Sequence, residues 1–435
     1  MPKKPPDKKA DAKAPRKPSR RVAAGGSETS PTPSPPRPLR DGGETPSAME
    51  PMLVGESSRH RGRLADLALE LTHQSAAFRA SLPAGIAEAL ATLVRAMNCY
   101  YSNLIEGHNT HPVDIERALR DDFSTDTRRR NLQLEARAHI AVQAWIDDGG
   151  IAGVATTKAA LLEIHRRFCA ALPEALLWAE DPATGERAAV EPGALRDRDV
   201  KVGRHVAVSP GAVPRFLDRF EAAYRGLGRV DAILAAAAAH HRLLWVHPFL
   251  DGNGRVARLM SHAMLKDALD TGAVWSVARG LARAEGRYKQ HLAACDLPRR
   301  NDLDGRGNLS EEALAEFTAF FIEAAIDQVS FMRGLIEPSL LKSRIALWAE
   351  EETRMGRLPP QSGQILEALL YRGTLPRGDV PALLGIGDRQ ARRITADLIE
   401  AGVITAETTK SPLKLAFPAR LAGRWMPGLF PDRTE

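Results

Sequence analysis

Apolar residues recur at helical spacing over most of residues 60–345. In the segment Ile86–Glu106 they fall three and four positions apart, which predicts an amphipathic helix with Gly107 as its C-terminal cap. Ser310 precedes another long apolar pattern and is a good N-cap. The other predicted helices are Leu132–Trp145, Ala159–Ala171, Pro214–Tyr224, Asp231–Val246, Arg255–Leu269 and Glu311–Leu335. We therefore expect a mainly α-helical domain over residues 58–345.

One segment breaks this helical pattern. Residues Asp199–Val208 alternate apolar and polar side chains on both sides of Gly203-Arg204. Alternation over so few residues, with a glycine in the middle, is typical of a short β-hairpin. We expect this hairpin within the otherwise helical domain.

Residues 355–420 form a second predicted unit, a winged helix-turn-helix. It has three short helices followed by two alternating segments, which would form the wing. The helices are Gln364–Tyr371, Asp379–Leu384 and Asp388–Ala401, with Asp388 as N-cap, and the strands are Gly402–Ala406 and Leu413–Phe417. All the residues with candidate chemistry precede this unit, so its removal is expected to leave the chemistry in place.

The third helix of this unit carries several basic residues, as a DNA recognition helix would. The basic residues are Arg389, Arg392 and Arg393, and the polar Gln390 lies among them. Yet residues 361–420 hold eight basic against six acidic residues, a small excess for a domain that binds phosphates. The balance favours a protein-docking or dimer-supporting role over DNA binding.

Composition predicts a disordered tail over residues 1–57 and a short tail over residues 421–435. Residues 1–47 are rich in Pro, Lys, Arg and Ser and nearly devoid of large apolar residues. They hold 11 Lys and Arg against 5 Asp and Glu, and the remaining residues carry 49 of each sign, so the net charge of +6 lies in this tail. The basic character therefore does not indicate a nucleic-acid-binding body.

Cysteine usage and hydropathy indicate a cytoplasmic protein without a membrane span. The three cysteines are far apart in sequence and form no C-x-x-C pair, so neither disulfides nor a zinc site is predicted. The longest apolar run, Ala232–Ala239, is too short for a bilayer. The N-terminus lacks the apolar stretch of a secretory signal.

Candidate chemistry is concentrated between two predicted helices, in the segment His247–Arg258, which reads HPFLDGNGRVAR. Gly252 and Gly254 permit a tight turn whose backbone N–H groups meet at a helix N-terminus, a natural anion site. Arg255 and Arg258 share one face of the first helical turn. Because two cations at a helix N-terminus are unfavourable by themselves, we expect an anion to bind there.

The remaining polar residues of this segment suit nucleotide chemistry. Asp251 is a hard oxygen ligand suited to Mg²⁺ between phosphates, and Asn253 can donate to a phosphate oxygen. His247 can accept a proton from a hydroxyl near neutral pH. A lone G-x-G is usually a plain turn. The joint occurrence of these residues within twelve positions favours nucleotidyl transfer.

At this point residues 60–345 resemble the Fic family of protein AMP-transferases. The family's signature, H-x-F-x-[D/E]-G-N-G-R-x-x-R, is met at every fixed position of His247–Arg258. The resemblance implies a Fic-type helical core that moves AMP from ATP to a protein hydroxyl. It implies that His247 is the general base and that Asp251 holds Mg²⁺ between the α- and β-phosphates.

The resemblance also assigns nucleotide-binding roles. Gly252, Asn253 and Gly254 would form the anion hole for the α- and β-phosphates. Arg255 would support the β-phosphate and Arg258 the γ-phosphate. Tyr288 resembles an aromatic residue that lies near the adenine in related proteins.

The predicted hairpin resembles the family's flap, beside which a target segment docks. Its first strand and turn are Val200, Lys201, Val202 and Gly203. A target strand added to such a hairpin is held by backbone hydrogen bonds with little demand on sequence.

The end of the helix at 86–107 resembles the family's inhibitory motif, [S/T]-x-x-x-E-[G/N]. Ser102, Glu106 and Gly107 occupy its fixed positions. By this resemblance Glu106 pairs with Arg258, which deprives the γ-phosphate of its partner. The chain thus resembles the subclass with an N-terminal inhibitory helix.

Two further readings stay open. The same fold can remove AMP or use another nucleotide donor, and a DNA-binding regulator can use a Fic core as a nucleotide sensor. For the leading reading we expect ATP as substrate, Mg²⁺ as cofactor and a protein with an exposed Ser, Thr or Tyr hydroxyl as target. That target can be the protein itself, and a homodimer is expected.

Overall fold

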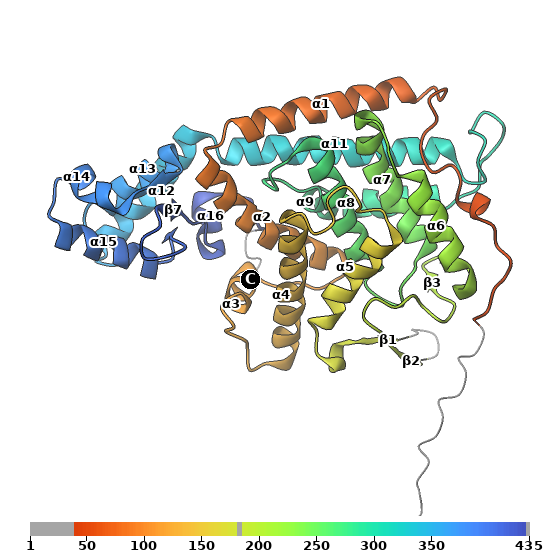
Figure 1. Ribbon diagram of the computed structural model, residues 1–435, viewed down its shortest axis with the longest axis horizontal. Helices are drawn as coiled ribbons and strands as arrows, with labels where there is room; N and C mark the ends of the chain where they lie inside the picture. The colour runs from red at the N-terminus through yellow and green to blue at the C-terminus, as the bar shows by residue number, and fades with distance from the viewer. Residues whose placement is uncertain (1–38, 181–184, 432–435) are drawn as a thin grey trace, which may run out of the picture. The chain divides into compact units, whose positions relative to one another are not determined.

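Helices α7 (Arg229–Val246) and α8 (Asn253–Leu269) form the centre of the fold and pack closely against each other. The computed structural model describes residues 39–180 and 185–431, which belong to one compact unit beginning at Leu39. Alanines 235–239 of α7 are at most 1% exposed. A helix that is apolar on all sides is buried, so the candidate loop joins the two central helices (Figure 1).

The other helices and the strands surround this pair. The helices before the C-terminal region are α1 (Arg61–Ala80), α2 (Ala84–Ile105), α3 (Pro112–Ala118), α4 (Thr127–Asp147), α5 (Lys158–Ala170), α6 (Val213–Ala223), α9 (Ala278–Arg283), α10 (Glu285–Cys295), α11 (Glu311–Leu335) and α12 (Pro338–Arg354). Two antiparallel hairpins lie between α5 and α6: β1 (Trp178–Glu180) with β2 (Arg187–Ala189), and β3 (Lys201–Val202) with β4 (His205–Val206).

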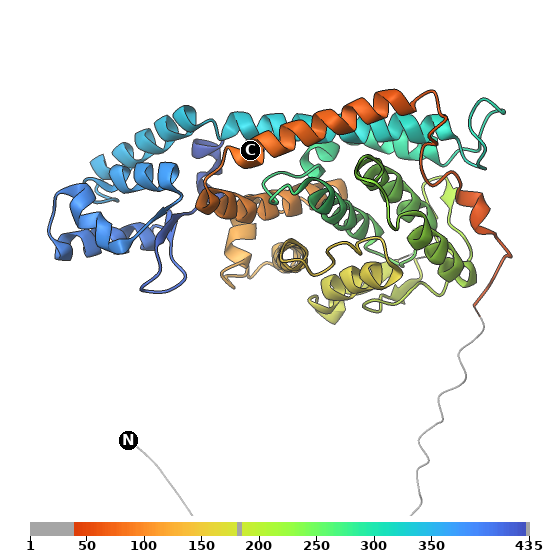
Figure 2. The ribbon, with the colours of Figure 1, turned by 45° about the horizontal axis from the view of Figure 1, so that its top comes forward.

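Helices α1 and α11 run side by side along one face of the core (Figures 1 and 2). Helix α2 packs against α4 and α9, so its C-terminal end is held within the helical domain. Within the described residues, no helix is both long enough and apolar enough to cross a membrane.

The predicted helices and the predicted hairpin are present. Helix α11 covers the predicted range, and Ser310 caps it by accepting a hydrogen bond from the Ala313 amide at 3.0 Å. Hairpin β3–β4 turns at Gly203, which has a φ of 60°. One detail is wrong: Gly387, not Asp388, is the N-cap of α15.

The C-terminal region has three helices and a three-stranded sheet. They are α13 (Ser362–Arg372), α14 (Val380–Leu384), α15 (Asp388–Glu400), β5 (Thr374–Leu375), β6 (Ile404–Thr405) and β7 (Leu413–Leu415). Strand β7 pairs antiparallel with both β5 and β6, and β5 was not expected. The helices and the last two strands fall where the sequence places them, and the assignment as a winged helix-turn-helix stays a prediction.

Residues 39–57, which composition places in the disordered tail, pack on the helical domain. Met49, Met52 and Val54 are at most 4% exposed, and the Tyr224 hydroxyl donates to the Met52 carbonyl at 2.8 Å. The predicted tail is therefore wrong for these residues, because the segment Met49–Val54 supplies apolar side chains that residues 1–47 lack. The rest of this predicted tail, residues 1–38, lies outside the described residues.

Residues 421–431 are not a tail either. Beyond the short helix α16 (Ala422–Trp425), Leu429 is fully buried, and the Tyr101 hydroxyl of α2 donates to its carbonyl at 3.0 Å. The Trp425 and Trp348 rings meet edge to face with centroids 5.2 Å apart. Because this segment packs against α2, removing residues 421–431 would remove contacts of the helix that carries Ser102. Residues 432–435 lie outside the described residues.

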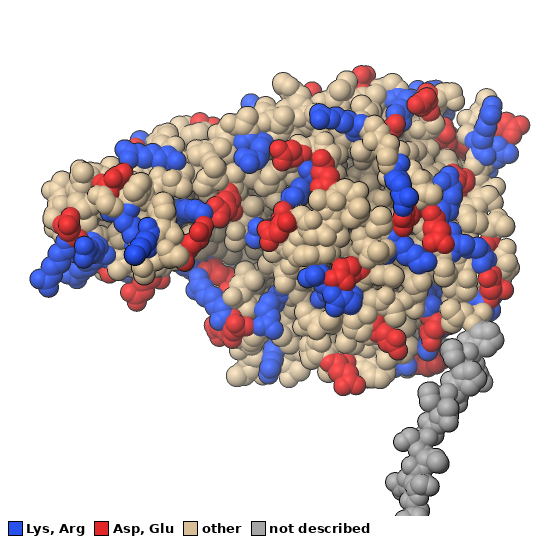
Figure 3. Space-filling model, viewed as in Figure 1, with Lys and Arg blue, Asp and Glu red and all other residues tan. Residues whose placement is uncertain are grey.

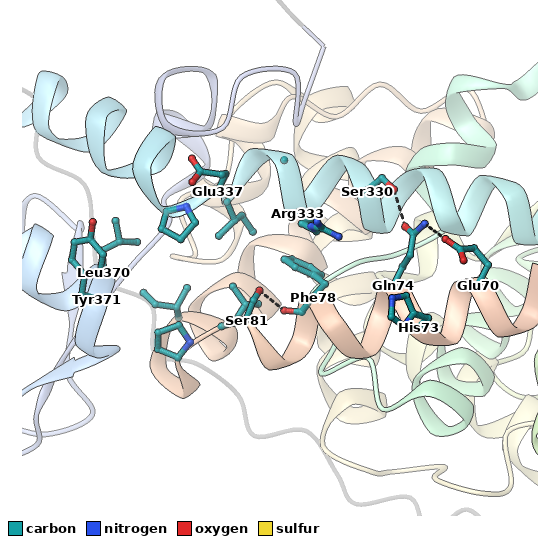
Figure 4. A pocket seen from close by; sticks show the side chains of 16 residues that line it. Glu70, His73, Gln74, Phe78, Ser81, Ser330, Arg333, Glu337, Leu370 and Tyr371 are labelled. Carbon is teal, nitrogen blue, oxygen red and sulfur yellow. Dashed lines mark hydrogen bonds between the residues drawn. The ribbon is translucent and has the colours of Figure 1, made fainter.

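A groove of about 860 Å³ lies where α1, α11 and α13 approach one another (Figure 4). Phe78 lines its floor, and the Ser330 hydroxyl donates to Gln74 of α1 at 2.9 Å. It shares no residue with the loop His247–Arg258, so it is separate from the candidate site.

Candidate active site

The loop between α7 and α8 is held by its own residues. The backbone leaves α7 at His247, which has a left-handed φ of 51°, and enters α8 at Gly252, with a φ of 82°. The Asn253 amide side chain accepts from the Phe249 N–H at 3.0 Å and donates to the Phe249 carbonyl at 2.8 Å. The oxygen and one N–H of this amide thus close the loop, and donation of its second N–H to a phosphate stays a prediction.

The N-terminus of α8, where the sequence predicts an anion site, has the Glu106 carboxylate over it. Gly254 lies in the first turn, where backbone N–H groups have no partner within the helix. A Cβ atom added to Gly254 would collide with Oε1 of Glu106 and lie 3.0 Å from the Arg258 guanidinium. Only glycine therefore allows Glu106 this close to the helix end, where the dipole favours negative charge.

Arg258 faces the end of α2. It is 3% exposed, its Nε donates to the Ser102 hydroxyl at 2.8 Å, and its Nη2 donates to the Ser102 carbonyl at 3.2 Å and to the Glu106 carboxylate. Burial raises the pKa of Glu106, but the charge and hydrogen bond of Arg258, together with the charges of Arg255 and His108, outweigh burial and lower the net pKa. The carboxylate is therefore ionised at neutral pH and paired with Arg258.

Arg255 is held by residues that the sequence did not single out. It is 7% exposed, lies 4.8 Å over the Phe168 ring and is 3.5 Å from the Glu135 carboxylate of α4. The same carboxylate lies 2.7 Å from Nδ1 of His108. No local motif marks Glu135, since it is one polar residue on a predicted helix.

The charges of this group support one another. The hydrogen bond to Glu135 raises the pKa of His108. Burial raises the pKa of Glu135, but His108 and Arg255 outweigh it and lower the net pKa. An ionised Glu135 thus fixes Arg255 and favours the protonated form of His108.

His247 is prepared to accept a proton. Its Nδ1 lies 3.3 Å from the Leu244 carbonyl, which can only accept, so Nδ1 carries the hydrogen and Nε2 keeps a lone pair. Burial lowers the pKa of His247 to about 4, so the ring is neutral at neutral pH. The missed residue Arg196 donates from Nε to the His247 carbonyl at 2.7 Å.

A cavity of about 290 Å³ opens beside the loop. Its polar lining residues are Glu106, His108, Glu135, Asp251, Gly252 and Arg255. Asp251 is exposed there, and one carboxylate with phosphate oxygens and water is a donor set that suits Mg²⁺. Within the described residues there is no cluster of three or more His, Cys, Asp or Glu that could hold a metal alone.

The first hairpin, β1–β2, forms an apolar wall of this cavity and was not predicted. Leu177, Trp178 and Val190 line the cavity from this side, opposite Phe168 of α5. Only three residue pairs form the ladder, from Trp178↔Ala189 to Glu180↔Arg187. So short an alternation is not distinguishable from a loop in the sequence.

The predicted flap lies at the end of α7. Val202 and Val206 are 48% and 64% exposed, and the His205 ring bonds to the Trp245 carbonyl at 2.7 Å. Val200 precedes the hairpin and accepts from the Ala207 N–H at 3.2 Å, and Lys201 is exposed. The hairpin therefore leaves exposed strand edges close to His247.

Tyr288 does not line the cavity. It is 2% exposed, and its hydroxyl lies 2.6 Å from Nε2 of His240, whose Nδ1 lies 2.9 Å from the Ser261 hydroxyl. Burial raises the pKa of Tyr288 to about 12. Its hydrogen bond directs this ring into the core, so contact with an adenine is not supported.

Part of the chain that carries this site matches a known protein family. Residues 155–265 match the model of the Fic/DOC family. The matched stretch contains both hairpins, α7 and the loop His247–Arg258. The end of α2, with Ser102 and Glu106, lies outside it.

Curated relatives carry the name protein adenylyltransferase Fic. The chain is 26% identical over 224 residues to the protein of Drosophila erecta and 29% identical over 225 residues to that of Drosophila willistoni. Each match covers 49% of this chain and 42% of the relative, so the chain spans less than half the length of these relatives. These names support nucleotidyltransferase activity at the level of the family.

Solved structures of Fic proteins are also similar. A Fic family protein from Desulfovibrio desulfuricans G20 matches with a TM-score of 0.49 and 16% identity, covering 84% of this chain and 98% of that chain.

Proposed function

We propose that this protein transfers AMP from ATP to a hydroxyl side chain of a protein. One observation carries the proposal: a neutral His247 with an open Nε2 stands at one end of a loop whose other end is a helix N-terminus with Arg255 and Arg258. A base for a hydroxyl and a site for a polyphosphate thus belong to the same twelve residues.

The proposed step needs little beyond positioning. The target oxygen forms a bond to the α-phosphorus while His247 Nε2 takes the hydroxyl proton. The bond from the α-phosphorus to its bridging oxygen breaks, and pyrophosphate leaves. Backbone N–H groups of Gly252–Gly254 and the two arginines would stabilise the charge on the phosphates. Asp251 would hold Mg²⁺, which neutralises phosphate charge when bound.

We further propose that Glu106 restrains this reaction. Its carboxylate occupies Arg258 and the space over Gly254, which is where a terminal phosphate would bind. ATP that enters while the pair is intact must bind without the Arg258 contact, which is an unproductive pose. Ser102 contributes by holding the same guanidinium.

The test is transfer of labelled AMP. The Glu106→Gly variant would be incubated with α-labelled ATP, Mg²⁺ and a cell lysate, with Glu106→Gly/His247→Ala as its control. Labelled proteins that depend on His247 would support the proposal. Absence of label on any protein, including the enzyme itself, would contradict it.

A second measurement, the release of AMP from modified proteins, distinguishes addition of AMP from its removal. If the wild type released AMP from modified proteins and Glu106→Gly did not, removal of AMP would be the favoured activity. Competition by GTP, CTP or UTP for label incorporation would reveal a different donor.

For the C-terminal region we propose a protein-docking role. Arg389, Arg392 and Arg393 of α15 are exposed, but Asp388 and Glu400 lie on the same helix. Figure 3 shows basic and acidic side chains interspersed over this end of the molecule. Salt-dependent binding of this protein to duplex DNA would instead support the regulator reading.

Compartment and assembly are part of the proposal. Cys99, Cys169 and Cys295 are buried free thiols, which suits a reducing cytoplasm. A homodimer stays a prediction. Measurement of the molar mass in solution by light scattering would test it.

A further inference from the structure

Arg196 is a buried cation whose hydrogen bonds, within the described residues, all go to backbone carbonyls. It is 1% exposed, and its Nη1 donates to the Arg198 carbonyl at 2.8 Å. Its Nη2 donates to the carbonyls of Val208 and, at 3.5 Å, Val246, and its Nε donates to that of His247 at 2.7 Å. Burial lowers the pKa of Arg196 to about 10, so it remains charged at neutral pH.

These bonds complete the C-terminus of α7. The last four carbonyls of a helix lack partners within it and lie at the negative end of its dipole. Here the Leu243 and Leu244 carbonyls are bonded by His247, the Trp245 carbonyl by His205 and the Val246 carbonyl by Arg196. Two of the three capping residues come from the segment that carries hairpin β3–β4.

The same guanidinium also joins the two stems of the hairpin. Arg198 precedes β3 and Val208 follows β4, and both carbonyls accept from Arg196. The Arg196 N–H donates to the Pro248 carbonyl at 2.9 Å, directly after His247. One planar side chain thus fixes the hairpin, the helix end and the left-handed backbone of His247 relative to one another.

We infer that Arg196 and His205 are positioning residues. They hold Nε2 of His247 within reach of the hydroxyl of a target strand docked on β3–β4. The inference rests on the proposed function. A strand added to the hairpin brings its hydroxyl to a point fixed by the hairpin, whereas the base is fixed by α7. Since a misplacement of about 1 Å can cost about 100-fold in rate, the joint between them sets the efficiency of transfer.

The experiment uses the full chain with Glu106→Gly as the parent. Arg196→Met is compared with Arg198→Met, which removes an exposed guanidinium two residues away that pairs with Asp197. We expect Arg196→Met to lower kcat for AMP transfer about 100-fold while ATP affinity stays unchanged, and Arg198→Met to match the parent. If Arg196→Met does not fold, Arg196→Lys is measured in its place.

His205 supplies a conservative rescue. His205→Leu removes the bond to the Trp245 carbonyl and should lower kcat, whereas the amide of His205→Gln can still donate and should restore much of it. If His205 had a merely structural role, His205→Leu and His205→Gln would both have a lower melting temperature, and their kcat values would not differ in this way. Equal kcat for parent and Arg196 variant would overturn the inference and leave the proposed function intact.

If the parent transfers no AMP, the proposed function fails and a second readout decides the inference. The nitrogen NMR shifts of His247 report which ring nitrogen is protonated. We expect the Nδ1–H form in the parent and a mixture of tautomers in Arg196→Met, because the helix end is no longer fixed. An unchanged His247 spectrum would overturn the positioning role.

Discussion

Glu106 accepts a hydrogen bond from Arg258, a residue 152 positions later in the chain. The contact joins the C-cap of α2 to the second turn of α8, and Ser102, one turn earlier on α2, binds the same guanidinium. Arg258 is thereby used on two sides before any nucleotide arrives. The strength of this pair decides how often Arg258 is available to a phosphate.

Replacing Glu106 by glycine should activate the protein. Without the carboxylate, Arg258 and the space over Gly254 become available to the terminal phosphate of ATP. Each 1.36 kcal/mol of lost restraint is tenfold in rate, and we expect at least about a tenfold rise in auto-modification. Incorporation of AMP from α-labelled ATP measures it.

The matched control is Asp148→Gly. Asp148 is an exposed acidic C-cap of α4 with φ −80° and ψ 5°, close to the −81° and 1° of Glu106. Its replacement should leave the signal unchanged. The double variant Glu106→Gly/Arg258→Ala should lose the gain. Equal labelling of wild type and Glu106→Gly would rule out the restraint.

Local signals explain why much of the fold and loop could be predicted. Helix α11 follows from apolar periodicity and the Ser310 cap, both contained in its own sequence. The candidate residues of the loop His247–Arg258 are neighbours in sequence, so their chemistry can be predicted without the tertiary structure. The contact between Glu106 and Arg258 was expected from resemblance alone, since no local pattern joins α2 to α8.

Long-range partners explain what was missed. Arg196 binds carbonyls about fifty residues away, and Glu135 meets Arg255 across 120 residues. Any arginine or glutamate could make such contacts, so the residue type predicts nothing. The loop-closing role of Asn253 was missed for the opposite reason: its partner, Phe249, is local, but only the folded turn reveals the contact.

Replacing His247 by alanine should abolish transfer and leave ATP binding in place. The phosphate-binding groups of α8 remain, whereas the proton acceptor is lost. General-base catalysis contributes about 10²–10⁴-fold, so kcat should fall by at least about 100-fold. Comparison of kcat with the ATP dissociation constant tests this. His111→Ala, at the exposed N-cap of α3, is the control, and a wild-type rate in His247→Ala would exclude the proposed base.

Replacing Asp251 by alanine should weaken the response to Mg²⁺. Asp251 is the only carboxylate in the loop and faces the cavity. In the Glu106→Gly background we expect at least about a tenfold lower rate at limiting Mg²⁺, since metal stabilisation of phosphate charge is worth several kcal/mol. Asp302→Ala, with a side chain 98% exposed, should have no effect. Full activity of the parent in EDTA would contradict the assignment.

The His108–Glu135 pair should make stability depend on pH. Glu135 raises the pKa of His108 above 6.5, so the stabilisation from charged His108 is complete below about pH 6.5 and is lost as pH rises through the folded pKa. The pKa of Glu135 is lowered below 4.5, so its contribution is lost only as pH falls through that lower value. Both contributions are present near pH 6.

Glu135→Gln should therefore lower the melting temperature more at pH 6 than at pH 9. The part that persists at pH 9 reflects the contact with Arg255. In a His108→Asn background the cost of Glu135→Gln should no longer depend on pH over this range. A cost that is the same at both pH values in the parent would show that His108 and Glu135 are not coupled.

The C-terminal segment should stabilise the domain that carries the chemistry. Trp425 and Met426 are 1% exposed and Leu429 is fully buried. Tyr101 and Arg279 donate to the carbonyls of Leu429 and Gly428 at 3.0 and 2.9 Å. Truncation of large buried side chains costs about 2–5 kcal/mol each, against a total stability of about 5–15 kcal/mol for a typical domain.

Leu429→Ala should thus lower the free energy of unfolding by about 2–5 kcal/mol in urea, and a chain ending at Arg420 should not fold stably. The control is a chain ending at Pro431, which keeps every buried residue of this segment and should match the full-length protein. Because Tyr101 directly precedes Ser102, Leu429→Ala should also loosen the end of α2 and raise auto-modification toward that of Glu106→Gly. A stable, fully restrained chain ending at Arg420 would show that α2 is held by α4 and α9 alone.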